Sequence, residues 1–328
     1  MRQWLGEHVK ISRFKPQAII PEASTRQFWR LRSATSTLIG MYSPPESEQN
    51  EQFCLLSDTF RANQVPVPEV YAKDLEHGYL LVSDVGETDF EAIYRTPLRD
   101  QALAEALKVL VHIQQVQSED IPPYTSERFH DELGIFEDWL CDKWLGISAE
   151  PLEMIKDLLI QRIQDQPKCV IHRDFHCRNL LFSENSHQLG VVDFQDALVG
   201  PSAYDLASLV YDCYHEFSSD DIDSYLQRFL DLSQETETYI AQDINELTCA
   251  VELCAIQRQL KAVGIFCRLV YLQQKSTHLK FVVPVMQRIA SLTSKHADFK
   301  GFESWLLNEV IPRSADQLPK LYAQSSGG

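Results

Sequence analysis

The chain has 328 residues and a formal net charge of −17, from 30 Lys plus Arg against 47 Asp plus Glu. This length suggests about two domains, and a hydrophobic content of 44% excludes a wholly disordered chain. The acidic balance argues against nucleic acid and anionic membranes as partners, and no stretch of about 18 apolar residues is present to span a bilayer.

The first 84 residues read as short strands around one helix. The expected strands are 37–42, 70–73 and 79–82. Pro44 and Pro45 end the first strand because proline cannot continue a β-ladder, and Gly78 marks a hairpin turn between the other two. Residues 50–62 place Phe53, Leu56 and Phe60 on one helical face.

After Gly86 the pattern becomes helical. Thr96 is expected to cap a helix with Pro97 in its first position. The further expected helices are 151–164, 203–216 and 244–272, the last as one helix or a broken pair. Two short apolar runs, 169–171 and 189–192, read as buried strands that end in charged residues.

These elements predict an α+β protein of two lobes. The smaller lobe, 1–84, is rich in strands, and the larger lobe, 85–328, is mostly helical. A hinge is expected at Ser83, Asp84, Val85 and Gly86, where the composition changes.

The densest polar cluster, residues 172–179, follows the first buried strand. Asp174 stands five residues before Asn179, and Asp193 lies at the end of the next strand. Phosphoryl transfer needs such a set, because one carboxylate orients the attacking hydroxyl and accepts its proton. The amide oxygen and the other carboxylate hold Mg²⁺ on the nucleotide phosphates. The spacing therefore predicts phosphoryl-transfer chemistry.

Two other interpretations of this cluster remain open. His172, Asp174 and His176 alternate as metal ligands can on an extended segment, but this interpretation needs more histidines nearby, and His187 is expected to lie in a turn. Cys177 next to His176 could act as a nucleophile, although adjacent residues on an extended chain point to opposite sides. His172 itself is expected to be structural and to hydrogen-bond the backbone.

The eight cysteines form no Cys-x-x-Cys pair, which argues against a zinc ribbon or a thioredoxin-like site. In a chain of this size we expect reduced, mostly buried thiols, which suggests the cytoplasm. The first residues lack the apolar run of a signal peptide.

His-Arg-Asp with Asn five residues after the Asp, followed by a strand-end Asp-Phe, resembles the kinase superfamily. Gly200-Pro-Ser-Ala-Tyr-Asp-Leu206 is similar to the aminoglycoside phosphotransferase and choline kinase branch. Within that branch, the chain resembles the bacterial anomeric kinases of N-acetylmuramate and N-acetylglucosamine. The stretches that carry this resemblance are Glu22-Ala-Ser-Thr-Arg26, Tyr42-Ser-Pro-Pro45, Gly78-Tyr-Leu-Leu-Val82, Val192-Asp-Phe-Gln-Asp196 and 257–268.

The resemblance implies a two-lobed, protein-kinase-like fold that uses ATP and Mg²⁺. Asp174 would be the catalytic base, Asn179 and Asp193 the metal ligands, and Asp205 a structural tie of the catalytic loop. The implied nucleotide-binding residues are Ser24, Thr25, Arg26, Arg32, Ser83, Asp84 and Val85. Asp205 has a second interpretation, since Ser202 and Asp205 have the spacing of a capping box at a helix start.

In the general kinase pattern, a lysine on the strand expected at 37–42 binds the phosphates. This sequence has Met41 where that lysine is expected. Neither a G-x-G-x-x-G loop nor a P-loop motif occurs anywhere in the sequence. The missing cation could be Arg26, Arg30 or Arg32, with Glu48 or Glu51 as its partner, and the sequence does not choose among them.

Arg258, Lys261 and Arg268 lie within about 80° of arc on the expected long helix. They could face an anionic sugar or a phosphate, or they could form a solvated helix face with local salt bridges. His176 and Arg178 project from the catalytic loop and could reach sugar hydroxyls, although Arg178 could equally brace the loop.

The resemblance implies phosphorylation of the anomeric hydroxyl of N-acetylmuramate or N-acetylglucosamine, in recycling of peptidoglycan sugars. The expected partner is therefore a small sugar, and we expect a monomer. Two alternatives are a kinase for another hydroxyl compound, such as an aminoglycoside or choline, and a pseudokinase that binds nucleotide without turnover.

Overall fold

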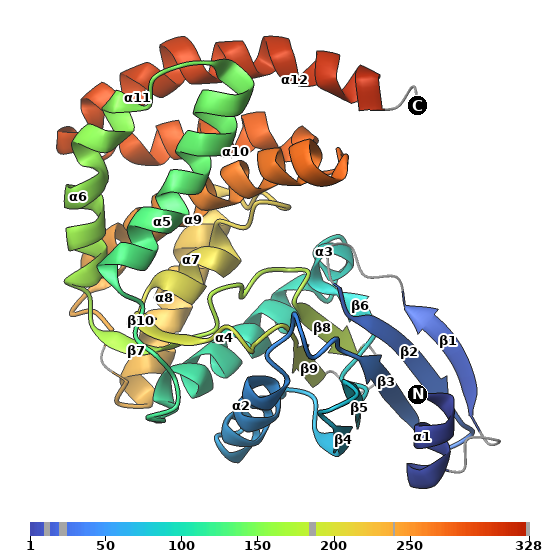
Figure 1. Ribbon diagram of the computed structural model, residues 1–328. Coiled ribbons are helices and arrows are strands. Elements are labelled where there is room, and N and C mark those ends of the chain that lie inside the picture. Colours follow the sequence, from blue (N-terminus) through green and yellow to red (C-terminus); the bar gives the residue numbers. More distant parts are fainter. Residues whose placement is uncertain (10–13, 20–24, 184–187, 239, 326–328) are drawn as a thin grey trace. The chain divides into compact units, whose positions relative to one another are not determined.

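A computed structural model of the chain describes residues 1–9, 14–19, 25–183, 188–238 and 240–325 (Figure 1). The chain divides into two compact units. The first unit contains residues 1–121 and 172–197, and the second contains residues 122–171 and 198–328. These units group residues by packing, so the functional division into 1–84 and 85–328 stays a prediction.

The first unit is built on a five-stranded antiparallel sheet in the order β1-β2-β3-β5-β4 (Figure 1). The strands are β1 (Lys15–Ile19), β2 (Gln27–Arg32), β3 (Thr37–Tyr42), β4 (Val70–Asp74) and β5 (Tyr79–Ser83). All three strands expected in this region are confirmed. Helix α1 (Arg2–His8) packs its Leu5 side chain with Leu31 and Leu81 on one face of the sheet.

The hairpin between β4 and β5 turns at Gly78, as expected. Gly78 has a φ of +70°, in the left-handed region that glycine adopts without steric cost. A Cβ atom there would lie 2.2 Å from the carbonyl oxygen of Ser43, so the residue also permits a close approach of two chain segments. The N–H of Ser43 donates to the carbonyl of Gly78 across 2.8 Å.

Three further helices and a second sheet complete the first unit. The helices are α2 (Asn50–Ala62), α3 (Phe90–Ile93) and α4 (Arg99–Gln115). The second sheet has the order β6-β8-β9, from β6 (Thr88–Asp89), β8 (Leu180–Ser183) and β9 (Gln188–Val191). The helix expected at 50–62 and the strand expected near 189–192 are confirmed.

The expected start of the helix after Gly86 is wrong. Helix α4 begins at Arg99, not at Pro97, and Leu98 occupies its N-cap. Thr96 instead closes the turn after α3, because its hydroxyl donates to the carbonyl of Ile93 at 2.9 Å and accepts from the N–H of Leu98 at 3.2 Å.

The second unit is mostly helical, and several of its other helices pack around α9 (Ile244–Gln273), which is a single unbroken helix. The other helices are α5 (Ser126–Phe136), η2 (Glu137–Leu145), α6 (Glu150–Gln164), α7 (Tyr204–Val210), α8 (Ser219–Glu235), α10 (Leu279–Thr293), η3 (Ala297–Phe299), α11 (Lys300–Trp305), η4 (Leu306–Val310) and α12 (Ile311–Ser325). Helices α5, α6, α7, α8 and α10 all pack against α9. Most of its side chains are consequently buried, as its apolar composition on every face requires.

A two-stranded antiparallel sheet, β7 (Lys168–Ile171) with β10 (Leu198–Pro201), also belongs to this unit. Helix α7 is shorter than the expected 203–216, because the Asp212 carboxylate accepts the N–H of Tyr214 at 2.8 Å and turns the chain away. The expected capping box is wrong too: Ala203 is the N-cap of α7, and no side chain caps it. The Ser202 N–H donates to the carbonyl of Pro167 at 2.9 Å, which delays the helix start.

None of the helices in the described ranges combines the length and apolar composition that a membrane crossing requires.

Candidate functional site

The catalytic loop predicted from sequence, residues 172–179, precedes β8 in the first unit. His172 is fully buried, and its Nε2 donates to the carbonyl of Val192 at 3.0 Å. Burial lowers the pKa of His172, because the protein interior disfavours the charged ring. His172 thus makes a backbone hydrogen bond of the kind expected for a structural histidine. It ties the loop to the strand end that carries Asp193.

Asn179 holds the loop closed around Asp174. Its side-chain Nδ2 donates to the main-chain carbonyl of Asp174 at 2.9 Å. Its main-chain carbonyl accepts the N–H of Val192 at 3.0 Å, so Oδ1 of the side chain is not used in either bond. Because the amide nitrogen is used in this way, Oδ1 is the atom of Asn179 that suits a metal ion.

Asp193 follows β9 in a left-handed backbone conformation, with a φ of +66°, and Arg173 in the loop has a φ of +78°. Such angles are unfavourable for side chains with a Cβ atom and concentrate at functional sites. Asp193 is exposed to solvent, and the protein atoms packed around its carboxyl group together with the charge of Asp174 raise its pKa. Gln195 opposes both effects, because its Nε2 donates to Asp193 Oδ1 at 2.8 Å.

The two carboxylates therefore repel each other within one site. Chemically, such a pair with an adjacent amide oxygen fits a divalent cation that neutralises the repulsion and is completed by phosphate oxygens and water. Among the described residues, no group of three or more His, Cys, Asp and Glu side chains could hold a metal by itself. That is compatible with Mg²⁺, which takes one or two carboxylates plus substrate phosphates.

This geometry also bears on the two other interpretations of the loop. His172 is buried and engaged with Val192, which leaves it poorly placed as a metal ligand, and His187 lies outside the described residues. Cys177 is fully buried, so its thiol is unsuited to attack a substrate. All eight cysteines lie in described ranges, and none forms a disulfide.

The residues expected to bind the nucleotide phosphates are described from Thr25 onward, while Ser24 lies outside the described residues. The Thr25 hydroxyl donates to Glu48, and the Arg26 guanidinium forms an ion pair with the same carboxylate at 2.9 Å. Arg32 pairs instead with Glu87, and its side chain is 41% exposed.

The expected hinge, Ser83 to Val85, lines a cavity of about 1470 Å³ in the first unit. Arg30 fixes it: its Nε and Nη2 donate to the Asp84 carboxylate at 2.7 and 3.1 Å, and Nη2 also donates to the carbonyl of Gly86 at 2.7 Å. The Ser83 N–H donates to the carbonyl of Glu69 at 2.9 Å. The N–H of Ser83 is therefore already engaged, and the nucleotide-binding role expected of Ser83, Asp84 and Val85 stays a prediction.

His176 and Arg178 are half-buried in the loop, and the Arg178 N–H donates to His176 Nδ1 at 3.4 Å. The Arg178 guanidinium pairs with Glu91 of α3, Nε to Oε2, at 3.0 Å. Neither Glu91 nor Gln195 was singled out as a site residue from sequence. Gln195 could have been noticed from its place in the stretch Val192 to Asp196. Glu91 gave no signal in the sequence, because it lies 87 residues before its partner Arg178.

The basic residues of α9 lie in the second unit. Arg258 and Lys261 are buried, and Lys261 Nζ lies 3.4 Å from Oε1 of Glu132, while Arg268 is half-buried. Asp205 on α7 is fully buried and close enough to Cys169 to help raise the pKa of that thiol. The roles expected for these residues stay predictions.

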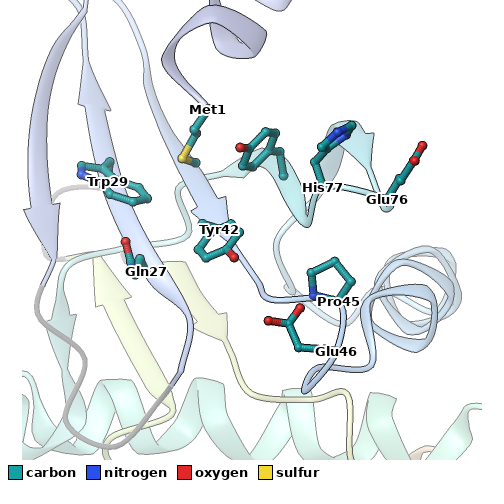
Figure 2. A pocket seen from close by; sticks show the side chains of 9 residues that line it. Met1, Gln27, Trp29, Tyr42, Pro45, Glu46, Glu76 and His77 are labelled. Carbon is teal, nitrogen blue, oxygen red and sulfur yellow. The ribbon is translucent and has the colours of Figure 1, made fainter.

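A second pocket of about 770 Å³ lies on the face of the sheet that also carries α1 (Figure 2). Its lining includes the aromatic residues Trp29, Tyr42 and Tyr79 and the acidic residues Glu46 and Glu76. None of the site residues expected from sequence lines it. The cluster of Asp174, Asn179 and Asp193 is therefore a separate feature of the first unit.

The sequence profile of the phosphotransferase enzyme family matches residues 17–239. The chain belongs to this family. It is accordingly a phosphotransferase that acts on a hydroxyl acceptor, and the matched range includes the whole constellation of Asp174, Asn179 and Asp193.

The chain is similar to several proteins named N-acetylmuramate/N-acetylglucosamine kinase. The protein of Pseudomonas aeruginosa is 30% identical over 80% of this chain and 80% of its own length. That of Neisseria meningitidis serogroup B is 28% identical over 94% of this chain and 95% of its own length.

Solved structures of low identity share the fold. Plasmodium vivax ethanolamine kinase superposes with a TM-score of 0.65 at 10% identity, over 87% of this chain and 85% of that one. An amicoumacin kinase in complex with AMP-PNP and Ca²⁺ gives a TM-score of 0.59 at 13% identity, over 88% and 92% of the two chains. The expected protein-kinase-like α+β fold is therefore confirmed.

Proposed function

We propose that the protein transfers the γ-phosphoryl group of ATP to the anomeric hydroxyl of N-acetylmuramate or N-acetylglucosamine and forms the sugar 1-phosphate. The observation that carries the reaction type is the set of Asp174, Asn179 and Asp193 in one site of the first unit. The sugar is supported by the two relatives and their long alignments.

In this proposal Asp174 orients the acceptor hydroxyl and takes its proton as the bond to phosphorus forms. Asn179 Oδ1 and the Asp193 carboxylate hold Mg²⁺, which when bound neutralises charge on the phosphates. Gln195 keeps Asp193 in place through its hydrogen bond, and His172 holds the loop against the strand end. The backbone of the hinge holds the adenine end of the nucleotide.

The proposed role is the recycling of peptidoglycan sugars. The thiol state of all eight cysteines supports a reducing compartment, in agreement with the prediction of a cytoplasmic enzyme. The monomeric state stays a prediction.

The test measures ADP release with ATP and Mg²⁺ in the presence of N-acetylmuramate, N-acetylglucosamine, plain hexoses, choline or an aminoglycoside. We expect turnover on the N-acetyl sugars only, lost in Asp174→Ala, and a phosphorus NMR signal of a sugar 1-phosphate. Turnover on choline or the aminoglycoside alone would replace the proposed acceptor. Nucleotide binding without turnover on any acceptor would favour a pseudokinase.

A further inference from the structure

Met41, which stands where a phosphate-binding lysine is expected, lies on the sheet face opposite the pocket of Figure 2. Met41 pairs with Phe28 across β2 and β3, and Tyr42, which lines that pocket, pairs with Gln27. Because side chains alternate along a strand, Met41 and Ser43 point to one face and Tyr42 to the other. Arg26 continues the alternation of Phe28 and therefore lies on the face of Met41, opposite Ser43.

The other two candidate arginines serve the hinge. Arg30 makes a two-pronged contact with Asp84 and a third bond to the carbonyl of Gly86. Arg32 pairs with Glu87, one residue further along the chain. Both thus act on the segment 84–87, and of the three arginines only Arg26 has a contact to the region before α2.

Arg26 is held on three sides. Glu48 pairs with it at 2.9 Å, the Ser43 hydroxyl accepts from its Nε at 3.1 Å, and the ring of Phe53 lies 5.6 Å from the guanidinium carbon. Phe53 in turn stacks on Phe194 with a centroid distance of 4.9 Å. The side chain is thereby fixed between the sheet, α2 and the residue directly after Asp193.

The segment that supports Arg26 is itself anchored. The Ser43 N–H donates to the carbonyl of Gly78 at 2.8 Å, and the Ser43 carbonyl accepts from Asn50 Nδ2 at 2.8 Å. Two of the stretches that carry the family resemblance contain none of the catalytic residues: Tyr42-Ser-Pro-Pro45 and Gly78-Tyr-Leu-Leu-Val82. These contacts assign a structural role to Ser43 in the first and to Gly78 in the second.

We propose that Arg26, held by Glu48 and Ser43, is the cation that binds the nucleotide phosphates in place of the lysine missing at Met41. This inference rests on the proposed function, because it assumes a nucleoside triphosphate next to Asp193. A lysine in the usual position and an arginine from the neighbouring strand would deliver positive charge to the same face. The arginine would bind phosphate through a planar fork of donors instead of a point charge.

The test compares Arg26→Gln, Arg26→Lys and Glu48→Gln with Arg313→Gln. Arg313 is a matched control, since it forms an exposed ion pair with Glu309 at 3.3 Å on the last helices of the second unit. The dissociation constant of Mg²⁺-AMP-PNP is measured by calorimetry without any sugar, and KM for ATP and for the sugar are then measured separately. Thermal unfolding without nucleotide checks that each variant is folded.

We expect Arg26→Gln to weaken AMP-PNP binding about 100-fold, a loss typical of one buried charge-assisted contact, and to leave KM for the sugar unchanged. Arg26→Lys should restore most of the binding because it restores the charge, Glu48→Gln should cost about tenfold, and Arg313→Gln nothing. Should Arg26→Gln fail to fold, Glu48→Gln decides the question by the same readout, since unchanged AMP-PNP binding in that variant would overturn the inference.

Unchanged AMP-PNP binding in folded Arg26→Gln would overturn the inference and leave the sugar-kinase proposal standing. Nucleotide binding that depends on Arg26, in a protein that phosphorylates none of the sugars, would support the inference and overturn the proposed acceptor. No nucleotide binding by the unmodified protein would overturn both.

Discussion

The side-chain amide of Asn179 donates to the main-chain carbonyl of Asp174, 2.9 Å away, and so closes the loop between the two residues. The bond fixes the spacing between the proposed catalytic base and a proposed metal ligand. It also determines which amide atom faces the metal, since only the oxygen remains for it. One short hydrogen bond therefore connects the acceptor side of the site with its metal side.

Asn179→Ala should lower kcat at least about 100-fold, because it removes both the proposed metal ligand and the hydrogen bond to the Asp174 carbonyl. Raising the Mg²⁺ concentration should recover only part of the loss, since the ligand can be compensated but the loop contact cannot. Steady-state kinetics as a function of Mg²⁺ concentration measure this. Asn63→Ala is the control, because Asn63 makes the same kind of bond to the carbonyl of Thr59 at 2.9 Å. Full recovery at high Mg²⁺ would show that the bond to Asp174 is unimportant.

Asp193→Asn should abolish activity and yet raise the melting temperature of the metal-free protein at pH 7. Surrounding protein atoms and the charge of Asp174 raise the pKa of Asp193 above the ordinary value of 3.8, and the effect on the melting temperature is small because the residue is exposed to solvent. Its stabilising contribution is therefore fully present below pH 3.8 and is lost as the pH rises through the folded-state pKa. The neutral asparagine escapes this loss, so its advantage should disappear in strong acid.

Differential scanning fluorimetry across pH, with and without Mg²⁺-nucleotide, measures this effect. Asp157→Asn is the control, because the Asp157 side chain is 91% exposed. An unchanged or lower melting temperature for Asp193→Asn at pH 7 would contradict the electrostatic account.

Local patterns predicted most of the elements around the site. Pro44 and Pro45 marked the end of β3, and residues 50–62 carried the periodicity of α2. The start of α4 was mispredicted because Thr96 has two possible uses in sequence, a helix cap or a turn closure, and tertiary packing chose the second. Short local signals of this kind compete with each other until the neighbouring element is known.

In the site, too, local spacing could be predicted from the sequence and long-range contacts could not. The spacing of Asp174, Asn179 and Asp193 was visible because all three lie within 20 residues. The acidic partners of Arg26 and Arg30 could not be predicted from the sequence. Glu48 and Asp84 are 22 and 54 residues away, and several other carboxylates were equally plausible. Long-range ion pairs depend on strand register and on loop paths, which the sequence pattern alone does not determine.

Arg178 offers a test between two roles, a contact to the sugar and a brace of the loop. The ion pair with Glu91 favours the brace, with side chains 20% and 26% exposed. We therefore expect Arg178→Gln and Glu91→Gln to lower kcat by the same modest factor, about three- to tenfold, with the double variant no worse than either single one. A higher KM for the sugar in Arg178→Gln alone would show that Arg178 contacts the substrate.

Lys261→Met should destabilise the second unit by about 1.5–3 kcal/mol, because it removes the buried ammonium 3.4 Å from Glu132 and leaves the more exposed Arg128, 3.8 Å away, as a charged partner. Gln257 and the hydroxyl of Tyr124 also donate to Glu132, so the carboxylate belongs to a buried polar network. The double variant Glu132→Gln/Lys261→Met should recover much of the loss, since both charges are gone. Urea unfolding followed by circular dichroism measures these energies. A raised KM for the sugar in Lys261→Met, without destabilisation, would support a substrate-facing stripe on α9.

Gly190→Ala should weaken nucleotide binding by displacing the hinge. A Cβ atom at Gly190 would lie 2.4 Å from the carbonyl oxygen of Val85 and 2.6 Å from its Cβ, so β9 and the hinge would have to separate. We expect KM for ATP to rise about tenfold and the melting temperature to fall, since overpacking costs about 1–3 kcal/mol. Gly134→Ala is the matched control, because a Cβ there meets nothing within 4 Å and alanine favours the helix by about 0.5–1 kcal/mol. If Gly190→Ala melts lower than the wild type but binds AMP-PNP equally well, contact between β9 and Val85 matters for stability only.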